Sequence, residues 1–349
     1  MKKIRIAQIG TGHDHAAATI WSIDRCRDVF DFVGYAVGED DYEKYEEEKG
    51  AYTPFKRYTV EEILSMDDLD AVAIETTELS SVKYAQMAAD RGLHVHLDKP
   101  GNESAEEFET LLSTIKKKGL ILSMGYMYRF NPAVVQALQQ ARAGELGEIY
   151  AVEAHMDCSH PQKKRQWLSQ FQGGMTFYLG CHLIDLVMNF KGVPDSVIPY
   201  NTPSGVEGVT AKDNGFVVLL YDEGGASFIK TCSAEAGGFM RRQLVVCGAK
   251  STVTIQPIEA FTGKGGSVLS AKSGISSIPN GATNAPWNND FDEKFEFEFD
   301  RYDPMMRNFA ERVCSGEQGE YTLEYEARLH RVILASCGID CDYKGEINL

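Results

Sequence analysis

The sequence has no excess of basic charge and no long hydrophobic run. Its 35 lysine and arginine residues are outnumbered by 51 aspartate and glutamate residues, giving a formal net charge of −16. Nucleic acids and anionic membrane surfaces attract proteins with a basic face, so neither is expected as a partner. No apolar run approaches the roughly 20 residues that a membrane span needs, and the first residues do not resemble a signal peptide. We therefore expect a cytoplasmic protein.

Paired cysteines are missing as well. The eight cysteines are spread along the chain, and none of them forms a C-x-x-C pair. This spacing is typical of reduced, mostly buried thiols, and it does not fit a disulfide framework or a zinc site built from cysteines. The length of 349 residues exceeds what one hydrophobic core usually supports, which predicts two domains.

The first part of the chain has the pattern of a dinucleotide-binding fold. A strand predicted at Ile4–Ile9 runs into the segment Gly10–His15, with the sequence GTGHDH, and an amphipathic helix is predicted to follow. In the G-x-G-x-x-G fingerprint, the glycines allow a tight turn and let the backbone approach a pyrophosphate at the helix N-terminus. The third glycine is absent here, because His15 stands in its place.

Further strand–helix units predict a doubly wound parallel sheet. Strands are predicted at Phe32–Val37, Ala71–Ile74 and Leu93–Leu97. Ligands bind at the carboxyl ends of the strands in such sheets. The residues expected to bind a dinucleotide there are Gly10, Thr11, Gly12, His13, His15, Glu39, Asp40, Thr76, Thr77 and Lys99.

The acids after the second predicted strand indicate which dinucleotide is bound. A carboxylate at this strand end usually hydrogen-bonds the adenosine ribose and repels the 2′-phosphate of NADP. Gly38 occupies the customary position, and Glu39 and Asp40 follow one and two residues later. We predict NAD as the cofactor in preference to NADP.

Lys99 is the second feature that suggests chemistry. In Asp98-Lys99-Pro100, the proline disfavours helix at Lys99, so the lysine is expected at the tip of a strand. A cation at this edge suits the binding of phosphate, or the polarisation of a substrate oxygen beside a nicotinamide. An exposed surface lysine is the plain alternative.

The third feature is the segment after Gly173-Gly174, which is predicted as an amphipathic helix. Tyr178, His182 and Asp185 are spaced i, i+4, i+7 and are predicted to share one face of it. A ring that can act as a base, beside a carboxylate and a phenol, suits proton transfer. A core helix that holds one histidine is the plain alternative.

Four segments, taken in order, resemble motifs of the glucose–fructose oxidoreductase / inositol 2-dehydrogenase family, written Gfo/Idh/MocA. They are the dinucleotide loop Gly10–Gly12, Asp98-Lys99-Pro100 in place of the family's Glu-Lys-Pro, the domain-crossing segment Tyr128–Pro132, and residues 173–185. The last resembles the motif G-G-x-x-x-D-x-G-x-H-x-x-D.

The resemblance implies an α/β fold with two domains. Residues 1–125 are expected to form a Rossmann domain with a doubly wound parallel sheet. Residues 126–349 are expected to form a substrate-binding and oligomerisation domain, α/β in class, with a large open, mainly antiparallel sheet that mediates a homo-oligomer. The sequence of this half predicts strands at 149–156, 215–221, 226–231, 243–247, 251–255 and 295–299, a long loop at 262–290, and helices at 304–315 and 322–337.

Position by position, the resemblance assigns catalytic roles to Lys99 and His182. Asp185 matches the family's acid three residues after the histidine, whereas Tyr178 stands where the family usually has aspartate. A phenol, with an ordinary pKa of about 10, does not supply that negative charge. The departure puts the usual proton relay in question, and the predicted catalytic set is Lys99, His182, Asp185 and Tyr178.

Substrate contacts are expected from Tyr128, Arg129, His155 and Trp167. His155, Asp157 and His160 form an H-x-D-x-x-H array, and with His182 they make a metal site conceivable. A polar lining of the substrate cleft is the preferred interpretation, so no metal is expected.

These features predict an NAD(H)-dependent oxidoreductase, a dehydrogenase acting on a secondary hydroxyl group of a sugar, a polyol or a related small molecule. Two alternatives remain. The first is a glycosidase or lyase that keeps NAD tightly bound and recycles it. The second is a catalytically silent dinucleotide-binding protein, suggested by Tyr178 and by the missing third glycine.

Overall fold

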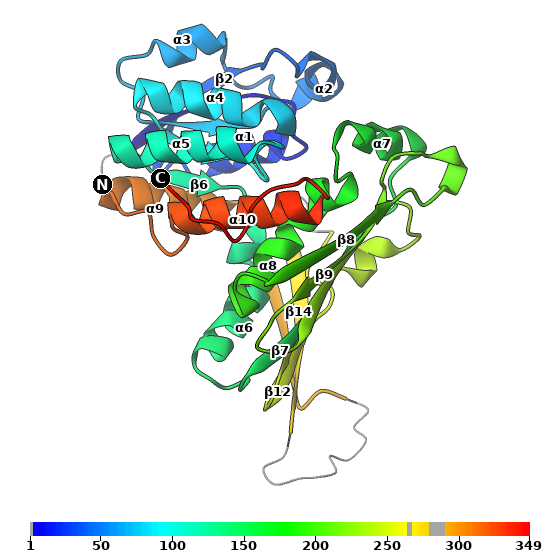
Figure 1. The fold of residues 1–349 in the computed structure, drawn as a ribbon. Coiled ribbons are helices and arrows are strands. Elements are labelled where there is room, and N and C mark those ends of the chain that lie inside the picture. Colours follow the sequence, from blue (N-terminus) through cyan, green and yellow to red (C-terminus); the bar gives the residue numbers. More distant parts are fainter. Residues whose placement is uncertain (1–2, 264–266, 279–289) are drawn as a thin grey trace. The chain divides into compact units, whose positions relative to one another are not determined.

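Figure 1 shows the fold of the protein in a computed structural model, which describes residues 3–263, 267–278 and 290–349. The chain divides into two compact units. Unit 1 consists of Met1–Met127, Tyr302–His330 and Gly345–Leu349, and unit 2 consists of Tyr128–Arg301 and Arg331–Lys344. Each unit is built around one β-sheet.

The sheet of unit 1 is six-stranded, in the order β3-β2-β1-β4-β5-β6, and each neighbouring pair is parallel. Its longer strands are rich in apolar residues buried on both faces, as parallel strands between helices require. The predicted doubly wound sheet is therefore confirmed. The strands are β1 (Ile4–Ile9), β2 (Phe30–Ala36), β3 (Arg57–Tyr58), β4 (Ala71–Ile74), β5 (His94–Leu97) and β6 (Leu122–Met124).

The helices of unit 1 begin and end at signals that the sequence carries. α3 begins with a capping box, in which Thr59 and Glu62 satisfy each other's backbone N–H groups. α4 and α5 end at Gly92 and Gly119, both in the left-handed conformation that glycine adopts without strain. The helices are α1 (Ala16–Arg25), α2 (Tyr42–Glu48), α3 (Val60–Leu64), α4 (Glu78–Arg91), α5 (Ala105–Lys118), α9 (Asp303–Ser315) and the first part of α10 (Leu323–Ser336).

The chain returns to unit 1 near its end. The division between the units falls at Met127/Tyr128, two residues after the predicted boundary, but α9 and the start of α10 join unit 1 instead of remaining in a second domain that runs to residue 349. The reason is local. Asp303, in the first turn of α9, accepts hydrogen bonds from Ser22 (2.6 Å) and Arg25 (2.6 Å) of α1. The ring of Phe309 lies 5.9 Å from that of His96 in β5.

Unit 2 holds a nine-stranded sheet in the order β13-β14-β12-β11-β7-β10-β9-β8, with β15 paired to β14. β7 and β10 pair in parallel, and the other pairs are antiparallel. The predicted mainly antiparallel sheet is confirmed. The strands are β7 (Ile149–Asp157), β8 (Ser196–Thr202), β9 (Asn214–Leu220), β10 (Ala226–Cys232), β11 (Gln243–Gly248), β12 (Ser251–Ile255), β13 (Ala260–Phe261), β14 (Val268–Ser277) and β15 (Glu293–Asp300).

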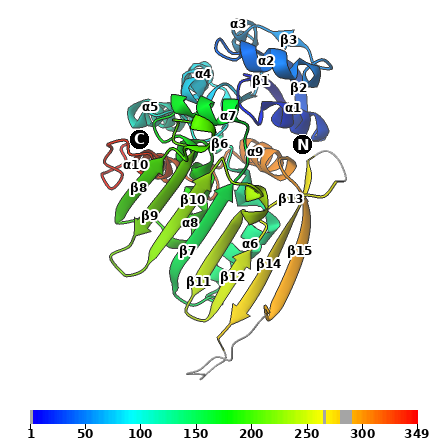
Figure 2. The ribbon, with the colours of Figure 1, turned by 90° about the vertical axis from the view of Figure 1, so that its right-hand side faces the viewer.

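Helices cover one face of this sheet. α6 (Pro132–Arg142) packs on β12, β14 and β15, and α8 (Cys181–Lys191) packs on β7 and β10. Figure 2 views the sheet from its other side, with α6 and α8 behind it. The short helix α7 (Gln162–Trp167) follows β7 along the chain. The strands alternate in burial: Ala154 and Met156 of β7 are fully buried, whereas His155 between them is partly exposed.

The loop predicted at residues 262–290 is wrong for its central part, where β14 forms. Its glycine and serine content suggested a loop, but pairing decides the structure, because β14 is hydrogen-bonded to β12 on one side and to β15 on the other. Alternate residues Leu269, Ala271 and Ile275 are buried. Residues 264–266 and 279–289 of the predicted loop lie outside the described residues. β8 was not predicted.

The fold bears on two predictions from the sequence, one about membrane-spanning helices and one about the cysteines. Across the described residues, every helix is too short or too polar to cross a membrane. All eight cysteines lie in the described ranges, and each is a thiol, five of them buried. The prediction of reduced, mostly buried cysteines is confirmed.

Candidate functional site

The dinucleotide loop follows β1 at the point where the strand order of unit 1 reverses. Gly10 has φ +105°, and a Cβ there would lie 2.2 Å from the backbone nitrogen of Thr76. A Cβ on Gly12 would lie 2.1 Å from Oδ1 of Asp41. A side chain at either position would therefore clash, because Gly10 lies against the end of β4 and Gly12 lies against a buried carboxylate.

That carboxylate, Asp41, was missed by sequence reasoning. Its Oδ2 accepts the N–H groups of Thr11 (2.8 Å) and Gly38 (3.0 Å), and its Oδ1 accepts the N–H of Thr77 (3.1 Å). Asp41 is completely buried, and burial raises its pKa against the lowering effect of these backbone groups. It ties together the loops that follow β1, β2 and β4.

Glu39 and Asp40, the acids predicted for the ribose, are exposed. The side chain of Glu39 reaches Lys83, 3.4 Å away. Asp41 N donates to Gly38 O (3.2 Å), and this turn folds Asp41 back over the loop. The signal for it was present in the sequence, because Gly38 followed by three acids allows a turn that buries the third one.

These residues fit a dinucleotide in two respects. First, the carboxylate of Asp41 accepts backbone N–H groups of the loops that follow β1, β2 and β4, and so holds the dinucleotide loop in shape. Second, a hollow of about 780 Å³ lies at the carboxyl ends of β2 and β3, lined in part by Val37, Tyr42, Arg57 and Tyr84. The aromatic part of its lining suits a flat ring, and charged side chains, among them Glu39 and Lys83, line the rest.

A group of ionisable side chains lies at the carboxyl ends of β1, β4 and β5. Oδ2 of Asp98 is 3.1 Å from Nδ1 of His13 and 3.0 Å from Nδ1 of His15. Burial lowers the pKa of His15 to about 4. Burial also raises the pKa of Glu75 well above its usual value, and the charge of Asp98 adds to this effect.

Lys99 lies in the same place. It is 2% exposed, and its backbone N–H donates to Oδ1 of Asp98 (2.7 Å). The plain alternative of an exposed surface lysine is wrong, because Lys99 is buried directly after the end of β5. Thr76 is buried, and Thr77 Oγ1 is 2.8 Å from Ser80 Oγ. The structure thus brings the predicted loop residues, Thr76, Thr77 and Lys99 together, whereas Glu39 and Asp40 remain exposed.

In unit 2, the segment around Tyr178 is not a continuous α-helix. Thr176–Gly180 is π-helical, and α8 begins at Cys181. The α-helical spacing assumed between Tyr178 and His182 therefore does not hold, and the two side chains have different neighbours. The ring of His182 is edge-on to Tyr128, with centroids 5.0 Å apart.

Tyr178 belongs to an aromatic cluster. Its ring is edge-on to Trp167 (5.4 Å) and stacked with Phe171 (6.4 Å). The ammonium of Lys164 lies 3.6 Å from the ring centroid of Trp167 and 4.9 Å from that of Tyr178. Cations bind favourably over such ring faces, so Lys164 completes the cluster.

Asp185 is paired with Arg129. The guanidinium donates from Nε to Oδ2 (2.9 Å) and from Nη2 to Oδ1 (2.8 Å), and both side chains are buried. Next to Arg129 in the chain, the hydroxyl of Tyr128 donates to Glu259 (2.5 Å). Burial raises the pKa of Tyr128 above its usual range. Glu259 was not foreseen, because nothing in its own sequence neighbourhood marks it.

His155, expected at the substrate, lies elsewhere. It alternates with Ala154 and Met156, which face the helices, so it points to the opposite face of the sheet from α8. Its ring is 5.6 Å from that of Phe228, and Asp157 pairs with Lys230 (3.0 Å). His155 therefore points away from α8, the helix that carries His182.

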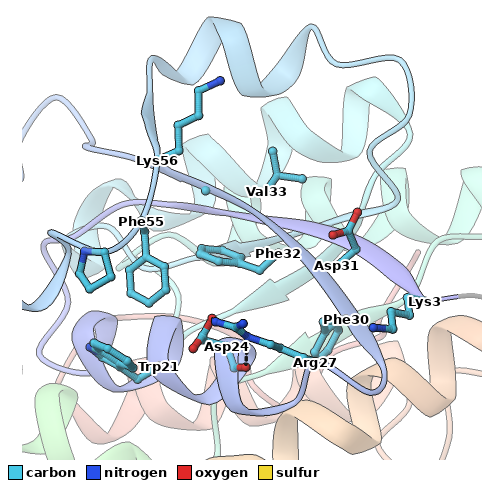
Figure 3. A pocket seen from close by; sticks show the side chains of 12 residues that line it. Lys3, Trp21, Asp24, Arg27, Phe30, Asp31, Phe32, Val33, Phe55 and Lys56 are labelled. Atoms are coloured by element: carbon cyan, nitrogen blue, oxygen red, sulfur yellow. Dashed lines mark hydrogen bonds and ion pairs between the residues drawn. The ribbon is translucent and has the colours of Figure 1, made fainter.

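A second hollow of unit 1, of about 590 Å³, carries no predicted site residue (Figure 3). Trp21, Phe32 and Phe55 pack edge to face along one side of it. It adjoins the first residues of β2, away from the carboxyl ends where the dinucleotide loop lies. It therefore has no part in the site.

Two family models match the chain. Residues 4–126 match the NAD-binding Rossmann fold of an oxidoreductase family, and residues 139–329 match the C-terminal alpha/beta domain of the same family. These are the models that carry the names glucose–fructose oxidoreductase, inositol dehydrogenase and MocA.

Individual relatives agree with this match. D-xylose 1-dehydrogenase (NADP(+)) 2 of Haloferax volcanii is 30% identical over 62% of this chain and 62% of its own length, so the match spans less than two thirds of that relative. The scyllo-inositol 2-dehydrogenase (NAD(+)) of Bacillus subtilis is 25% identical over 73% of this chain and 71% of its own length. The structure of KijD10, a 3-ketoreductase from Actinomadura kijaniata, has a TM-score of 0.74 at 17% identity, covering 95% of this chain and 96% of that one. This last likeness concerns the fold alone.

Proposed function

Because the chain belongs to the Gfo/Idh/MocA oxidoreductase family, we propose that it is an NAD(H)-dependent dehydrogenase acting on a secondary hydroxyl group of a sugar, polyol or related compound. The observation that carries the proposal is the burial of Lys99 beside the dinucleotide loop. Lysine is almost never fully buried unless it is paired or functional. The family motif gives this lysine a catalytic role.

The proposed mechanism divides the work between the cofactor and two side chains. The dinucleotide loop Gly10–Gly12 would hold NAD, which supplies a hydride acceptor when bound. His182 would take the hydroxyl proton, for which a neutral imidazole with an ordinary pKa of about 6.5 is suited. The ammonium of Lys99 would stabilise the negative charge that develops on the oxygen, and a water-poor site strengthens this effect.

Asp185 is proposed as a positioning residue. Both of its carboxylate oxygens are held by Arg129, so it has little capacity left to bind a sugar hydroxyl. His182 lies one turn before Asp185 on α8. We propose that the Arg129–Asp185 pair fixes this turn, and with it the direction of the imidazole.

The aromatic cluster is proposed as part of the substrate site. Carbon-bound hydrogens of a sugar or polyol ring pack well on aromatic faces, and Trp167 and Tyr178 provide such faces next to the ammonium of Lys164. Relatives named for xylose and inositol support a substrate of this class. Tyr178 replaces the family's acid, so its hydroxyl, not a carboxylate, would meet the substrate.

The test of the proposed function is whether NADH accumulates. Purified protein with NAD and a panel of sugars, polyols and glycosides is expected to form one NADH for each substrate oxidised. Cleavage of a glycoside without net NADH would instead support the redox-cycling glycosidase or lyase. Binding of NAD with no turnover across the panel would support the silent dinucleotide-binding protein, the alternative that Tyr178 suggests and that the presence of Lys99 and His182 argues against.

NAD is proposed over NADP because of Asp41. A carboxylate fixed beside the loop disfavours a 2′-phosphate. Arg57, whose guanidinium lies over the rings of Tyr42 (5.8 Å) and Tyr45 (4.9 Å) at the hollow, is the observation that favours NADP, and the name of the Haloferax volcanii relative includes NADP.

Replacing Asp41 by alanine is expected to weaken NAD binding about tenfold or more, because hydrogen bonds from N–H groups to a charged acceptor are each worth about 1.5–3 kcal/mol and hold the loop in shape. NADP binding should weaken less. The dissociation constants of both cofactors, measured by calorimetry, check this. The control is Glu46→Ala, an exposed acid on the neighbouring helix α2, which should change neither constant. Tighter binding in Asp41→Ala would mean that the carboxylate competes with the cofactor for these N–H groups.

A homo-oligomer formed through the sheet of unit 2 is also proposed. The face opposite α6 and α8 exposes Ile198, Tyr200 and Phe216 on the neighbouring strands β8 and β9. Clustered apolar side chains on an open sheet face favour association. Light scattering should give a mass of more than one chain; a monomer at all concentrations would remove this part of the proposal.

A further inference from the structure

Four ionisable side chains are almost completely buried together in unit 1, with His15 beside them. His13, Glu75, Glu78 and Asp98 are each at most 4% exposed. They come from the dinucleotide loop, the end of β4, the start of α4 and the end of β5. The atoms of His13, His15 and Asp98 that are able to bind a metal lie within 4.8 Å of one another.

We propose that this group, the histidine–carboxylate cluster, binds a divalent first-row transition-metal ion. The ligands are Nδ1 of His13, Nδ1 of His15 and a carboxylate oxygen of Asp98, with Glu75 as the fourth. Imidazole nitrogens combined with carboxylate oxygens suit zinc, iron and manganese.

The distances fit a shared ion. Both histidine nitrogens face the same oxygen of Asp98, at 3.1 Å and 3.0 Å. Four ligand atoms placed tetrahedrally at 2.0–2.1 Å from zinc are separated from one another by roughly 3.3 Å. The two separations between histidine nitrogen and Asp98 oxygen therefore match this value to within a few tenths of an ångström, and the two histidines lie within 4.8 Å of each other by their ligand atoms. Oε2 of Glu75 is 3.9 Å from Nδ1 of His13 and needs a somewhat larger shift.

The contacts of His13 also fit a bound cation. The backbone N–H of His15 donates to Nδ1 of His13 (3.1 Å), so this nitrogen is the unprotonated one, and an ion bound to its one lone pair would replace this hydrogen bond. The nitrogen nevertheless faces an oxygen of Asp98 at 3.1 Å. Two acceptors at this distance repel each other unless a positive charge lies between them, and an ion bound to both atoms would provide it.

The burial of Glu75 also supports a bound cation. Neither oxygen of Glu75 has a hydrogen-bond partner among the described residues, although its side chain is fully buried. Carboxylates buried in this way are normally paired with a cation or bound to a metal. Lys99 lies beside this group, and its one ammonium offsets only part of the charge that Glu75, Glu78 and Asp98 would carry as ligands and neighbours of a divalent ion.

Glu78 supports the proposed ligand His13. Its Oε1 faces Nε2 of His13, the other ring nitrogen, at 3.5 Å. A carboxylate at this nitrogen is the usual means by which a metal-binding histidine is kept in one orientation and one protonation state. Sequence alone did not indicate the site, because 83 positions separate His15 from Asp98.

Metal content of the purified protein tests the proposal. After dialysis against a chelator and reloading with ZnCl₂ or MnCl₂, the native chain is expected to hold one ion per chain by mass spectrometry. It should also unfold at a higher temperature with metal than without, because an ion that binds only the folded state adds about 2.7 kcal/mol at a concentration 100 times its Kd.

Two variants and a control separate the site from adventitious binding. His15→Ala and Glu75→Gln should lose the ion and the thermal shift; Glu75→Gln keeps the shape of the side chain and guards against loss through misfolding. His94→Ala is the control, because His94 lies on β5 of the same unit with its Nδ1 bonded to the backbone of Ile121, and it should bind metal as the native chain does. No ion in the native chain, or an equal content in His15→Ala, would overturn the proposal. Neither readout depends on NAD or on turnover, so a failed dehydrogenase assay leaves this test intact.

Discussion

Replacing Lys99 by methionine or His182 by alanine is expected to lower kcat by about 10²–10⁴-fold while the protein still binds NAD. The magnitude is that of losing a general base, or a group that stabilises charge on the reacting oxygen. Lys99→Met keeps the length of the buried side chain and removes only its charge. Steady-state kinetics on the substrate found by the NADH assay measure the loss of kcat, and calorimetry measures whether NAD binding is retained.

Lys83→Met is the matched control for Lys99→Met. Lys83 lies on α4 of the same unit, is exposed, and pairs only loosely with Glu39 at 3.4 Å, so its loss should leave kcat unchanged. Normal turnover in Lys99→Met or His182→Ala would remove that residue from the mechanism. A variant that no longer binds NAD would show that its main role is in cofactor binding.

Replacing Asp185 by asparagine is expected to lower the free energy of unfolding by about 3–5 kcal/mol, because it leaves the guanidinium of Arg129 buried without its counter-charge. The Arg129–Asp185 pair is nearly inaccessible, with side chains 3% and 1% exposed. The shift of the urea midpoint measures the effect. The double variant Arg129→Met/Asp185→Leu should recover much of the loss, because it removes both charges together.

An exposed ion pair provides the comparison. Lys272 and Glu296 lie 2.7 Å apart on β14 and β15, with side chains 55% and 72% exposed. Such pairs contribute little, because water and salt screen them, so Glu296→Gln should not move the midpoint measurably. If Asp185→Asn were equally silent in stability but lost activity, Asp185 would act on the substrate and not through the position of α8.

The parts of the fold that follow from local patterns were predictable. Buried β-branched strands, the turn at Gly10 and Gly12, and alternating helices identify the sheet of unit 1 without long-range information. β14 could not be predicted from local patterns. Its serines and glycine suit a loop by composition, and only pairing with β12 and β15 makes the segment a strand.

The residues of the site also divide into those that the sequence predicts and those that it does not. Lys99 and His182 lie in recognisable motifs, so their importance was readable from the sequence. Asp41 was not, because its role depends on a turn that brings it back to N–H groups 30 and 36 positions away. The π-helical turn at Thr176–Gly180 was likewise invisible, since counting residues assumes a uniform α-helix.

The return of the chain to unit 1 bears on how the protein is made. The amide of Gln318 hydrogen-bonds both the N–H (3.2 Å) and the C=O (2.6 Å) of Leu122, on the edge strand β6. In the sequence, 196 positions separate Leu122 from Gln318, so during synthesis the first six strands leave the ribosome well before Gln318 can cover this edge. The nascent sheet therefore waits with an open edge, the kind of surface that pairs with other chains. A fragment that stops at Met127 should aggregate for this reason, and chaperone capture of the growing chain should be greatest before α9 has been translated.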